Sequence, residues 1–285
     1  MAQPQAEALS ALMPGGEIVL LVAVLGACVG SFLNVVAWRL PREESVLWPA
    51  SHCPHCGTVL PWFENIPVFA WLVLKGRCRH CAAPIHPRYP LIEALSAGLW
   101  VLVLFARPDG IGAAPPLVPQ WLAGWALVSL LLLLALIDLD QLWIPEPICR
   151  WGLVAGVLVS AWIGWQQSPA QARELVKTHL LGAALGLIGF DSLSALAARW
   201  FGKPALGEGD GKVAALLGAW LGPVGMAMAT LLAVSVAALV GVVGLIIGIF
   251  NRQQPIPFVP FLAVGGVVLW CTGASPWLQA LLLPH

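Results

Sequence analysis

The sequence predicts an all-α polytopic membrane protein with about eight transmembrane helices and a small cytoplasmic CxxC…CxxC loop between helices 1 and 2. Hydrophobic residues make up 59% of the 285 residues and charged residues only 10%, whereas a soluble domain carries about 25% charge. The mean hydropathy is +0.86, and 15 Trp stand against one Tyr. These values exclude a soluble enzyme, a disordered chain and a disulfide-rich secreted domain.

The apolar segments are close to the length of about 20 residues that a membrane-spanning helix needs. No Lys or Arg precedes the first, so we expect a retained span rather than a cleaved signal peptide. The segment 213–250 must hold a tight hairpin around Gly222 to Thr230 or form one long helix, which would leave seven spans. The expected spans are 18–38, 89–106, 118–137, 148–166, 178–199, 213–229, 231–250 and 258–282.

These spans divide the chain into three parts: 1–38, the N-terminal tail and first transmembrane helix; 39–88, a polar loop; and 89–285, a helical membrane domain. Lys and Arg accumulate in cytoplasmic loops. In the eight-span arrangement, eleven of the 14 Lys and Arg lie on the side of loop 39–88. We therefore expect that loop in the cytoplasm. The net charge of zero gives no bulk attraction to nucleic acid.

Glycines recur at four-residue spacing in two of the expected spans. The pairs are Gly26 with Gly30, and Gly182 with Gly186. Such spacing lets two helix backbones approach closely, so we expect helix–helix contacts at these positions.

Loop 39–88 contains two CxxC pairs, Cys53-Pro-His-Cys56 and Cys78-Arg-His-Cys81. Four thiolates at this spacing can surround one Zn²⁺ tetrahedrally, and a site closed by four ligands is structural. Two disulfides or a redox pair are the alternatives, and a cytoplasmic location disfavours disulfides. A histidine could replace a Cys ligand, the candidates being His52, His55, His80 and His86. The remaining cysteines, Cys28, Cys149 and Cys271, are expected in the apolar core.

Acidic residues in or beside apolar segments are functional candidates, because a charge in hydrocarbon is costly. Asp138 ends an uncharged run, and Asp140 lies about 200° further round a helix, so the two cannot share a face. Asp210 lies among glycines, which permit close backbone approach. The candidates are Glu93, Asp138, Asp140, Asp191 and Asp210.

Asp138 and Asp210 fall on the same side of the membrane in the eight-span arrangement. Two carboxylates brought together there could share one proton, with one acting as general base on a water and the other as general acid on an amide. The alternatives are a helix N-cap or a partner for Lys212, and a proton or ion relay, as in a transporter. The glycine-rich stretch before Lys212 is too short at its first spacing for a nucleotide-binding P-loop.

Six motifs, in order over roughly 18–270, resemble those of the type IV prepilin peptidases, membrane aspartyl proteases that also N-methylate their product. Any one of them is weak, but six at fitting distances are specific. They are Gly30-Ser-Phe-Leu-Asn-Val-Val-Ala-Trp-Arg-Leu-Pro41; the CxxC pairs with Pro61-Trp-Phe-Glu-Asn-Ile-Pro67 between them; Arg88-Tyr-Pro-Leu-Ile-Glu93; Ile137-Asp138-Leu-Asp140 with Ile144-Pro145-Glu146; Gly207-Glu-Gly-Asp210 with Lys212; and Pro255-Ile-Pro-Phe258 with Pro260-Phe261.

The resemblance implies that Asp138 and Asp210 are the catalytic pair, and that the four cysteines of the CxxC pairs hold zinc. The implied substrates are type IV prepilins or secretion pseudopilins, cut after a glycine on the cytoplasmic face of the bacterial inner membrane. S-adenosylmethionine would methylate the new N-terminal residue. The resemblance makes segment 30–41 and the cysteine loop contributors to the methyl-donor site, and no residue of the chain is assigned to that site.

The sequence departs from the family pattern at a few positions. Gly211 stands where a bulky apolar residue is usual, Glu208 adds a negative charge near Asp210, and Val259 replaces a frequent glycine. Asp191 matches no family position. Three other functions remain as alternatives: a proton-coupled transporter that uses the same acids, a peptidase without methylation, and a structural secretion subunit with a degenerate site.

Overall fold

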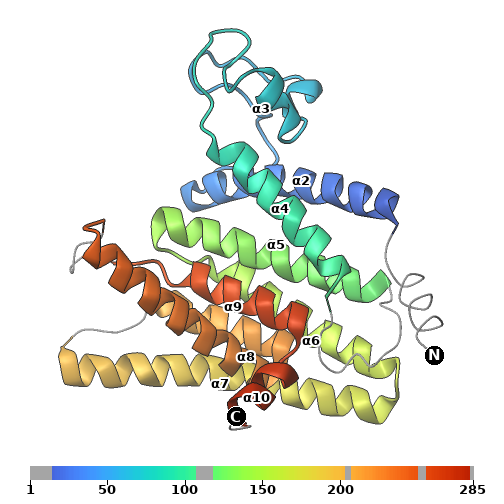
Figure 1. Cartoon of the computed structure of the whole chain (residues 1–285), viewed down its shortest axis with the longest axis vertical. Coiled ribbons are helices and arrows are strands. Elements are labelled where there is room, and N and C mark those ends of the chain that lie inside the picture. Colours follow the sequence, from blue (N-terminus) through green and yellow to red (C-terminus); the bar gives the residue numbers. More distant parts are fainter. Residues whose placement is uncertain (1–14, 107–117, 203–206, 250–254, 283–285) are drawn as a thin grey trace. The chain divides into compact units, whose positions relative to one another are not determined.

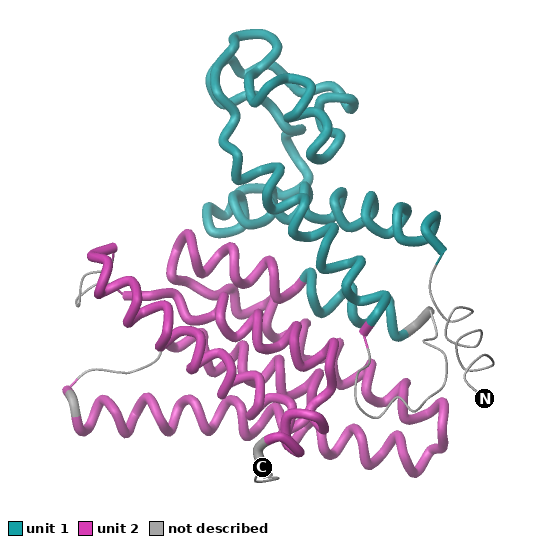
Figure 2. The backbone as a smooth tube through the Cα atoms, in the orientation of Figure 1, with its two compact units in different colours: residues 1–105, 115–129 teal, residues 106–114, 130–285 magenta. Residues whose placement is uncertain are grey.

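The computed structural model describes residues 15–106, 118–202, 207–249 and 255–282, and its regular elements there are helices. The chain forms two compact units: residues 1–105 with 115–129, and residues 106–114 with 130–285 (Figure 2). The boundary falls inside one long helix, α5 (Val118–Gln141). Of the basic residues behind the predicted orientation, Arg107, Lys203 and Arg252 lie outside the described residues.

Unit 1 is built on two helices that cross at closely spaced small residues (Figure 1). A Cβ atom on Gly26 would lie 2.8 Å from Trp100, and one on Gly30 would lie 2.7 Å from Ser96. The Ser96 hydroxyl donates to the carbonyl of Gly26 at 2.7 Å. The expected close approach at these glycines is confirmed. The elements are α2 (Gly16–Arg39), η1 (Leu40–Arg42), η2 (Trp62–Asn65), α3 (Phe69–Val73), α4 (Arg88–Leu104) and the first part of α5.

Unit 2 packs its helices around the second half of α5, in which the residues from Leu131 to Ile137 are all buried. This unit contains α6 (Glu146–Trp165), α7 (Pro169–Phe201), α8 (Glu208–Ile246), α9 (Val259–Thr272) and α10 (Ser275–Leu282). The core side chains, each at most 2% exposed, come from three helices: Leu131, Leu134, Ile137, Val213, Leu216, Leu217, Leu262 and Leu269.

Helices α7 and α8 touch along their backbones. A Cβ atom on Gly182 would lie 2.7 Å from the carbonyl oxygen of Gly218, and one on Gly186 would lie 2.6 Å from that of Ala214. The second predicted glycine pair is therefore confirmed as a packing contact. The start of α7 is fixed locally, because the side chain of Ser168 accepts a hydrogen bond from the N–H of Gln171.

Helix α8 reverses its direction at Gly222, where φ is 69° and ψ is 179°. Leu217 and Ala229 are twelve residues apart and would be separated by about 18 Å in a straight helix. They instead contact neighbouring residues of α9, Gly266 and Gly265 respectively. Of the two arrangements left open for 213–250, the structure therefore has the turn rather than one straight helix, and α8 comprises two helical stretches joined at Gly222.

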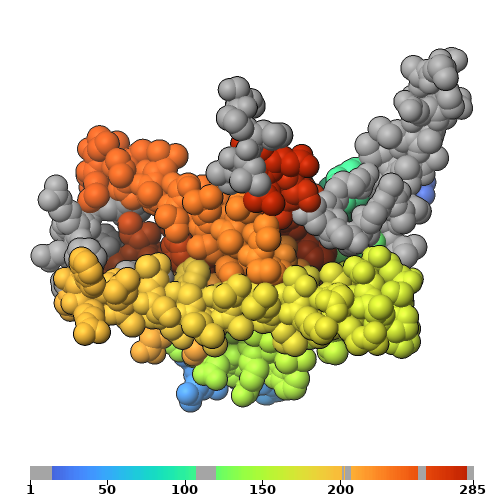
Figure 3. Space-filling model, turned by 90° about the horizontal axis from the view of Figure 1, so that it is seen from below, coloured from blue at the N-terminus to red at the C-terminus, as the bar shows by residue number. Residues whose placement is uncertain are grey.

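Five described helices are long and apolar enough to cross a membrane: the helix at Gly16–Arg42, α5, α6, α7 and α8. Two others that coincide with expected spans are shorter, α4 with 17 residues and α9 with 14. Figure 3 shows α7 running along one face of unit 2. That face carries exposed apolar side chains, as a lipid-facing helix requires: Leu180, Leu181, Leu185, Ile188, Leu193, Leu196 and Trp200. The all-helical, multi-pass class is confirmed.

Candidate functional site

Asp138 and Asp140 end α5 on different faces, as their spacing predicted. Asp138 is 6% exposed, whereas Asp140 is exposed on the surface. The run before them, Leu131 to Ile137, is buried throughout, so α5 carries Asp138 into the interior of unit 2 at its last turn.

The buried carboxylate of Asp138 holds the beginning of α9. Its Oδ2 atom accepts a hydrogen bond from the backbone N–H of Val259 at 3.0 Å. The first N–H groups of a helix lack partners within the helix and favour negative charge. This bond joins the first acidic motif to the end of the Pro255–Phe258 motif, across 121 residues of sequence.

Asp210 lies in the first turn of α8 and is 7% exposed. Its Oδ2 atom accepts a hydrogen bond from the N–H of Gly207, the residue that precedes the helix, at 2.8 Å. The N-cap role that the sequence left open for this acid is therefore present. It accounts for one oxygen of the carboxylate and fixes the direction of the side chain.

The two acidic motifs contact each other. A Cβ atom on Gly209 would lie 2.5 Å from Ile144, so only glycine fits beside that side chain. Lys212 Nζ lies 3.3 Å from Glu146 Oε2 in an ion pair between the starts of α8 and α6. Asp138 is also close enough for its charge to act on Asp210. Unit 2 thus brings together two buried carboxylates that are far apart in sequence.

The four cysteines of the CxxC pairs also come together. Their Sγ atoms all lie within 4.8 Å of one another, and none forms a disulfide. Cys53 Sγ and Cys81 Sγ are 3.8 Å apart, which is the separation of about 3.8 Å that two thiolates have around a tetrahedral Zn²⁺ with Zn–S bonds of about 2.3 Å. The donor set and its geometry fit a zinc ion. None of the histidines considered as replacements belongs to this cluster among the described residues.

The two CxxC pairs form one local structure twice. In the first, the N–H of Cys53 donates to Thr58 and the N–H of Gly57 donates to Cys53; in the second, Cys78, Ala83 and Ala82 make the same bonds. Gly57 and Ala82 occupy matching positions with positive φ, 69° and 57°. The copies differ where Thr58 in the first matches Ala83 in the second. The hydroxyl oxygen of Thr58 is hydrogen-bonded to Cys56 Sγ at 3.3 Å. This contact lowers the pKa of Cys56 to about 6 and favours the thiolate.

The other candidates separate into distinct positions. Glu93 is 8% exposed in unit 1, where its Oε2 accepts the N–H of Val68 at 2.6 Å. Asp191 is exposed on α7 and contacts Gly211. Cys149 is buried and Cys271 is half-buried, but the core position expected for Cys28 is wrong. Cys28 lies two residues from both Gly26 and Gly30, about 200° round the helix, and so faces away from α4.

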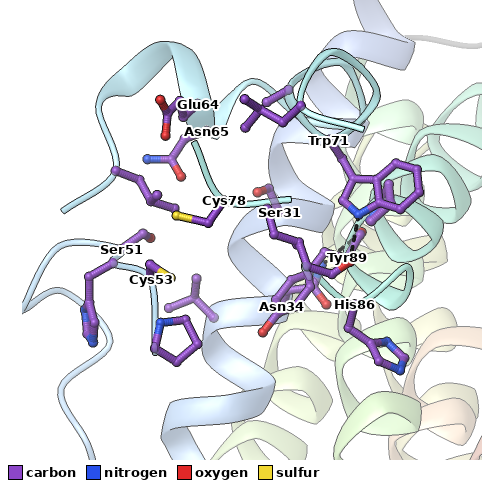
Figure 4. Close-up of a pocket in the computed structure, with 18 of the residues that line it drawn as sticks. Ser31, Asn34, Ser51, Cys53, Glu64, Asn65, Trp71, Cys78, His86 and Tyr89 are labelled. Atoms are coloured by element: carbon purple, nitrogen blue, oxygen red, sulfur yellow. Dashed lines mark hydrogen bonds between the residues drawn. The ribbon is translucent and has the colours of Figure 1, made fainter. Parts of the chain in front are cut away.

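One feature was not predicted from the sequence, a cavity of about 600 Å³ in unit 1 between α2, the start of α4 and the cysteine loop (Figure 4). Glu64, Glu93 and Trp71 are among the residues that line it. Its walls come largely from loop segments without helical or strand periodicity, so no pattern in the sequence indicates it. The only signal was Glu93, which stands out as an acid in an apolar segment.

These features define a class, a multi-pass membrane protein with paired buried aspartates at one end of a helical unit and a four-cysteine loop. Two family models match the chain. Residues 24–107 match the bacterial peptidase A24 N-terminal domain, and residues 125–243 match the type IV leader peptidase family.

Individual relatives agree. The type 4 prepilin-like proteins leader peptide-processing enzyme of Escherichia coli is 36% identical over 92% of this chain and 94% of its own length. The prepilin leader peptidase/N-methyltransferase of Burkholderia pseudomallei is 35% identical over 94% and 90%. A protein of the same name from Myxococcus xanthus is 42% identical over 70% of this chain, and the match spans about half of that relative, 54%.

The chain therefore belongs to the type IV leader peptidase family. No solved structure matches it.

Proposed function

We propose that the chain is a bifunctional enzyme that removes the leader peptide of type IV prepilins or secretion pseudopilins and N-methylates the new N-terminal residue. The peptidase activity is supported by one observation, the pair Asp138 and Asp210. These two buried carboxylates come together at the last turn of α5 and the first turn of α8. The relatives from Myxococcus xanthus and Burkholderia pseudomallei are named for both a leader peptidase and an N-methyltransferase, which supports both activities.

In this mechanism Asp138 and Asp210 share one proton. The ionised carboxylate takes a proton from a water as its oxygen attacks the scissile carbonyl carbon, and the protonated one donates to the leaving amide nitrogen. The backbone bonds from Val259 and Gly207 hold one oxygen of each carboxylate. The other oxygen of each is left for the water and the amide. Because the pair is coupled, it titrates as a unit.

The methyl donor is S-adenosylmethionine. When bound, it would supply an activated methyl group to the new N-terminal amine.

The four cysteines at 53, 56, 78 and 81 would hold a structural zinc ion. Such an ion would keep the loop folded, because the loop has little apolar core of its own.

We place the enzyme in the bacterial inner membrane, with both sites facing the cytoplasm. The excess of Lys and Arg on the side of loop 39–88 supports this orientation. A pilin leader junction lies where a basic segment meets an apolar helix, at the cytoplasmic membrane surface. The helix of the substrate could remain in lipid while its polar junction enters the site at the ends of α5 and α8.

The test uses full-length protein purified in detergent and incubated with a prepilin, with products measured by mass spectrometry. We expect Asp138→Asn and Asp210→Asn each to lower cleavage by ~10²-fold or more, since each removes an acid–base group. Asp140→Asn is the matched control, because Asp140 is exposed on the same helix end. With S-adenosylmethionine, the wild-type product should gain the mass of one methyl group.

Cleavage that survives Asp138→Asn or Asp210→Asn would refute the dyad and direct attention to Asp140 or Asp191. A folded wild-type protein that cleaves no prepilin would favour the transporter or the degenerate subunit. Cleavage without methylation would identify the peptidase-only variant.

A further inference from the structure

Helix α3, the short helix of the cysteine loop (Figure 1), exposes an apolar face. Phe69, Leu72 and Val73 lie at positions i, i+3 and i+4, on one side of the helix, and each is more than half exposed. Another side is anchored, because the indole N–H of Trp71 donates to the carbonyl of Ile85 at 3.0 Å. A contiguous exposed apolar surface marks a place that a partner or a membrane covers.

The segment 61–74 carries no charge on its surface. Its sequence contains one ionisable residue, Glu64. That side chain is only 3% exposed, and its Oε1 lies 3.0 Å from Arg79 Nε, so its charge is buried and paired. Trp62, in η2, is exposed. Because the single acid is turned inward, the surface from Trp62 to Leu74 is uncharged and mainly apolar, which is the composition that hydrocarbon requires.

Hydrogen bonds hold the start of α3 beside α2 rather than beyond its end. The N–H of Val68, which precedes α3, donates to Glu93 Oε2 on α4 at 2.6 Å. Glu93 lies at the level of Gly30 on α2, since a Cβ atom on Gly30 would be 2.9 Å from the Cα atom of Glu93. From Gly30 to Arg39, the last residue of α2, the helix rises by about 13 Å. Because α2 is long enough to cross a membrane, α3 begins within the depth that α2 spans.

The helices of unit 1 expose apolar side chains at this same level. Leu91 and Leu95, two residues before and after Glu93 on α4, are more than half exposed. Phe32, two residues after Gly30 on α2, is also more than half exposed. Glu93 itself is buried. Membrane-spanning helices face lipid with such side chains, so the start of α3 lies at a depth where the neighbouring surface faces lipid.

The backbone of α3 has its partners within the protein. The N–H groups of Ala70, Leu72 and Leu74 each donate to the carbonyl four residues before, and the N–H of Gly76 donates to the carbonyl of Trp71. In hydrocarbon no water is present to bond backbone groups, so internal bonds of this kind are a condition for entering it. The helix can therefore leave water without exposing these donors.

Two basic side chains follow α3. Lys75 and Arg77 are exposed, and neither forms an ion pair within the described part of the chain. Cationic side chains next to an apolar surface are typical of segments that lie in the membrane interface, since the phosphates of anionic lipids attract them.

We infer that residues 61–77 form a membrane-inserted element of the cysteine loop. Phe69, Leu72 and Val73 contact acyl chains in the leaflet on the side of loop 39–88, and Lys75 and Arg77 bind the phosphates of anionic lipids. The loop is then attached to the membrane at a third place besides its two ends. The inference concerns this attachment and does not rest on either proposed catalytic activity.

The apolar helix of a pilin substrate or a second copy of the chain could also cover such a face. Two observations favour lipid. The face begins beside a membrane-spanning helix, and the exposed Lys75 and Arg77 next to it would repel a basic leader peptide.

The experiment places a photoreactive residue on the face of α3. Full-length protein with benzoylphenylalanine in place of Phe69 or Leu72 is reconstituted in bilayers of phosphatidylcholine and phosphatidylglycerol, irradiated and analysed by mass spectrometry. We expect covalent lipid adducts at both positions. Val59 is the matched negative position, because it lies in the same loop, outside 61–77, and is exposed to a similar extent as Phe69. Leu20 is the positive reference, exposed on membrane-spanning α2.

Each other outcome contradicts the inference. Lipid adducts at Leu20 without adducts at Phe69 and Leu72 overturn it, and adducts of equal yield at Val59 deny that α3 is specifically inserted. Cross-links to a second copy overturn it in favour of a dimer interface, and cross-links to added prepilin overturn it in favour of substrate docking. Thermal unfolding shows whether each labelled protein is folded. Prepilin cleavage by the same samples tests the proposed function separately.

The double variant Lys75→Gln with Arg77→Gln tests the charges. In the protein labelled at Phe69, phosphatidylglycerol should be over-represented among the adducts relative to the bilayer, by up to about fivefold for each basic side chain near the lipid. The double variant should return the adducts to the composition of the bilayer. Arg173→Gln with Lys177→Gln makes the same change in charge on α7 and should leave the enrichment intact. Enrichment that persists in the first double variant overturns the role of its two cations.

Discussion

The carboxylate of Asp191 on α7 lies against Gly211 on α8: its Oδ1 is 3.1 Å from the position that a Cβ atom on Gly211 would take. In the sequence these residues are two separate departures from the family pattern, a glycine in place of a bulky side chain and an acid at an unexpected position. The structure relates them, because the missing side chain leaves the space beside which the acid lies. Gly211 directly follows Asp210, so this space borders the candidate site.

This relationship predicts how Gly211→Leu behaves. The larger side chain would displace Asp191 and press on Phe190, whose Cβ lies 3.4 Å from the same position. Overpacking of this kind costs about 1–3 kcal/mol, so the thermal unfolding midpoint in detergent should fall and cleavage should weaken. Removing the acid as well, in Gly211→Leu with Asp191→Ala, should recover part of both. A double variant no better than the single one would show that Asp191 is not the obstacle.

The contact between Gly209 and Ile144 predicts a second rescue. Gly209→Ala places a methyl group against Ile144, which should separate the two acidic motifs and reduce cleavage. The obstacle is a side chain whose Cβ also lies 2.7 Å from the new methyl group, so Ile144→Gly, which removes that atom as well, should restore part of the activity. Gly186→Ala is the contrasting case, since its obstacle is the backbone carbonyl of Ala214. No side-chain substitution at 214 should rescue it, as judged by thermal unfolding.

The repeated structure of the CxxC pairs predicts opposite effects at matching positions. Gly57 has positive φ, so Gly57→Ala should destabilise the loop by about 1 kcal/mol. Ala82 holds the same conformation with a Cβ atom, so Ala82→Gly should be neutral to stabilising, by less than about 1 kcal/mol. Resistance of bound metal to a chelator measures both. Equal losses in the two variants would argue against the equivalence of the two copies.

Metal removal provides a further prediction. We expect one zinc per chain by elemental analysis, and we expect its removal by a chelator to make the loop between α2 and α4 sensitive to protease. The reason is local, because the four cysteines join two separate parts of that loop and metal binding is coupled to folding. Zinc added back should restore the resistance. A metal-free protein whose loop resists protease as before would show that the loop keeps its fold without the ion.

Features set by local spacing were predictable from the sequence. The 200° offset between Asp138 and Asp140 follows from helix geometry alone, and it gave one buried and one exposed acid. The length of the apolar run 213–250 left two arrangements open, a hairpin around Gly222 to Thr230 or one long helix. The structure has a break at Gly222, where only a glycine adopts the backbone conformation without strain. The CxxC spacing likewise predicted a cluster of four sulfurs.

Features set by distant contacts were not predictable. The N–H of Val259 reaches Asp138 across 121 residues, and no periodicity encodes that pairing. In the sequence, Glu64 is one acid among others in a polar loop. The burial of its side chain could not be predicted, because it depends on how the loop folds around it. Cys28 was predicted in the core because its sequence neighbours are apolar, but it is exposed. Gly26 and Gly30 place the opposite face of α2 against α4.

The bond between Asp138 and Val259 also has a consequence for the order of biosynthesis. Asp138 is translated near the middle of the chain and Val259 near its end, so the N–H that binds the Oδ2 atom of Asp138 does not yet exist while α6, α7 and α8 are being made. The candidate site gains this contact only after nearly the whole chain has been translated. A chain shortened before residue 259 contains both aspartates and still lacks the bond that holds Asp138.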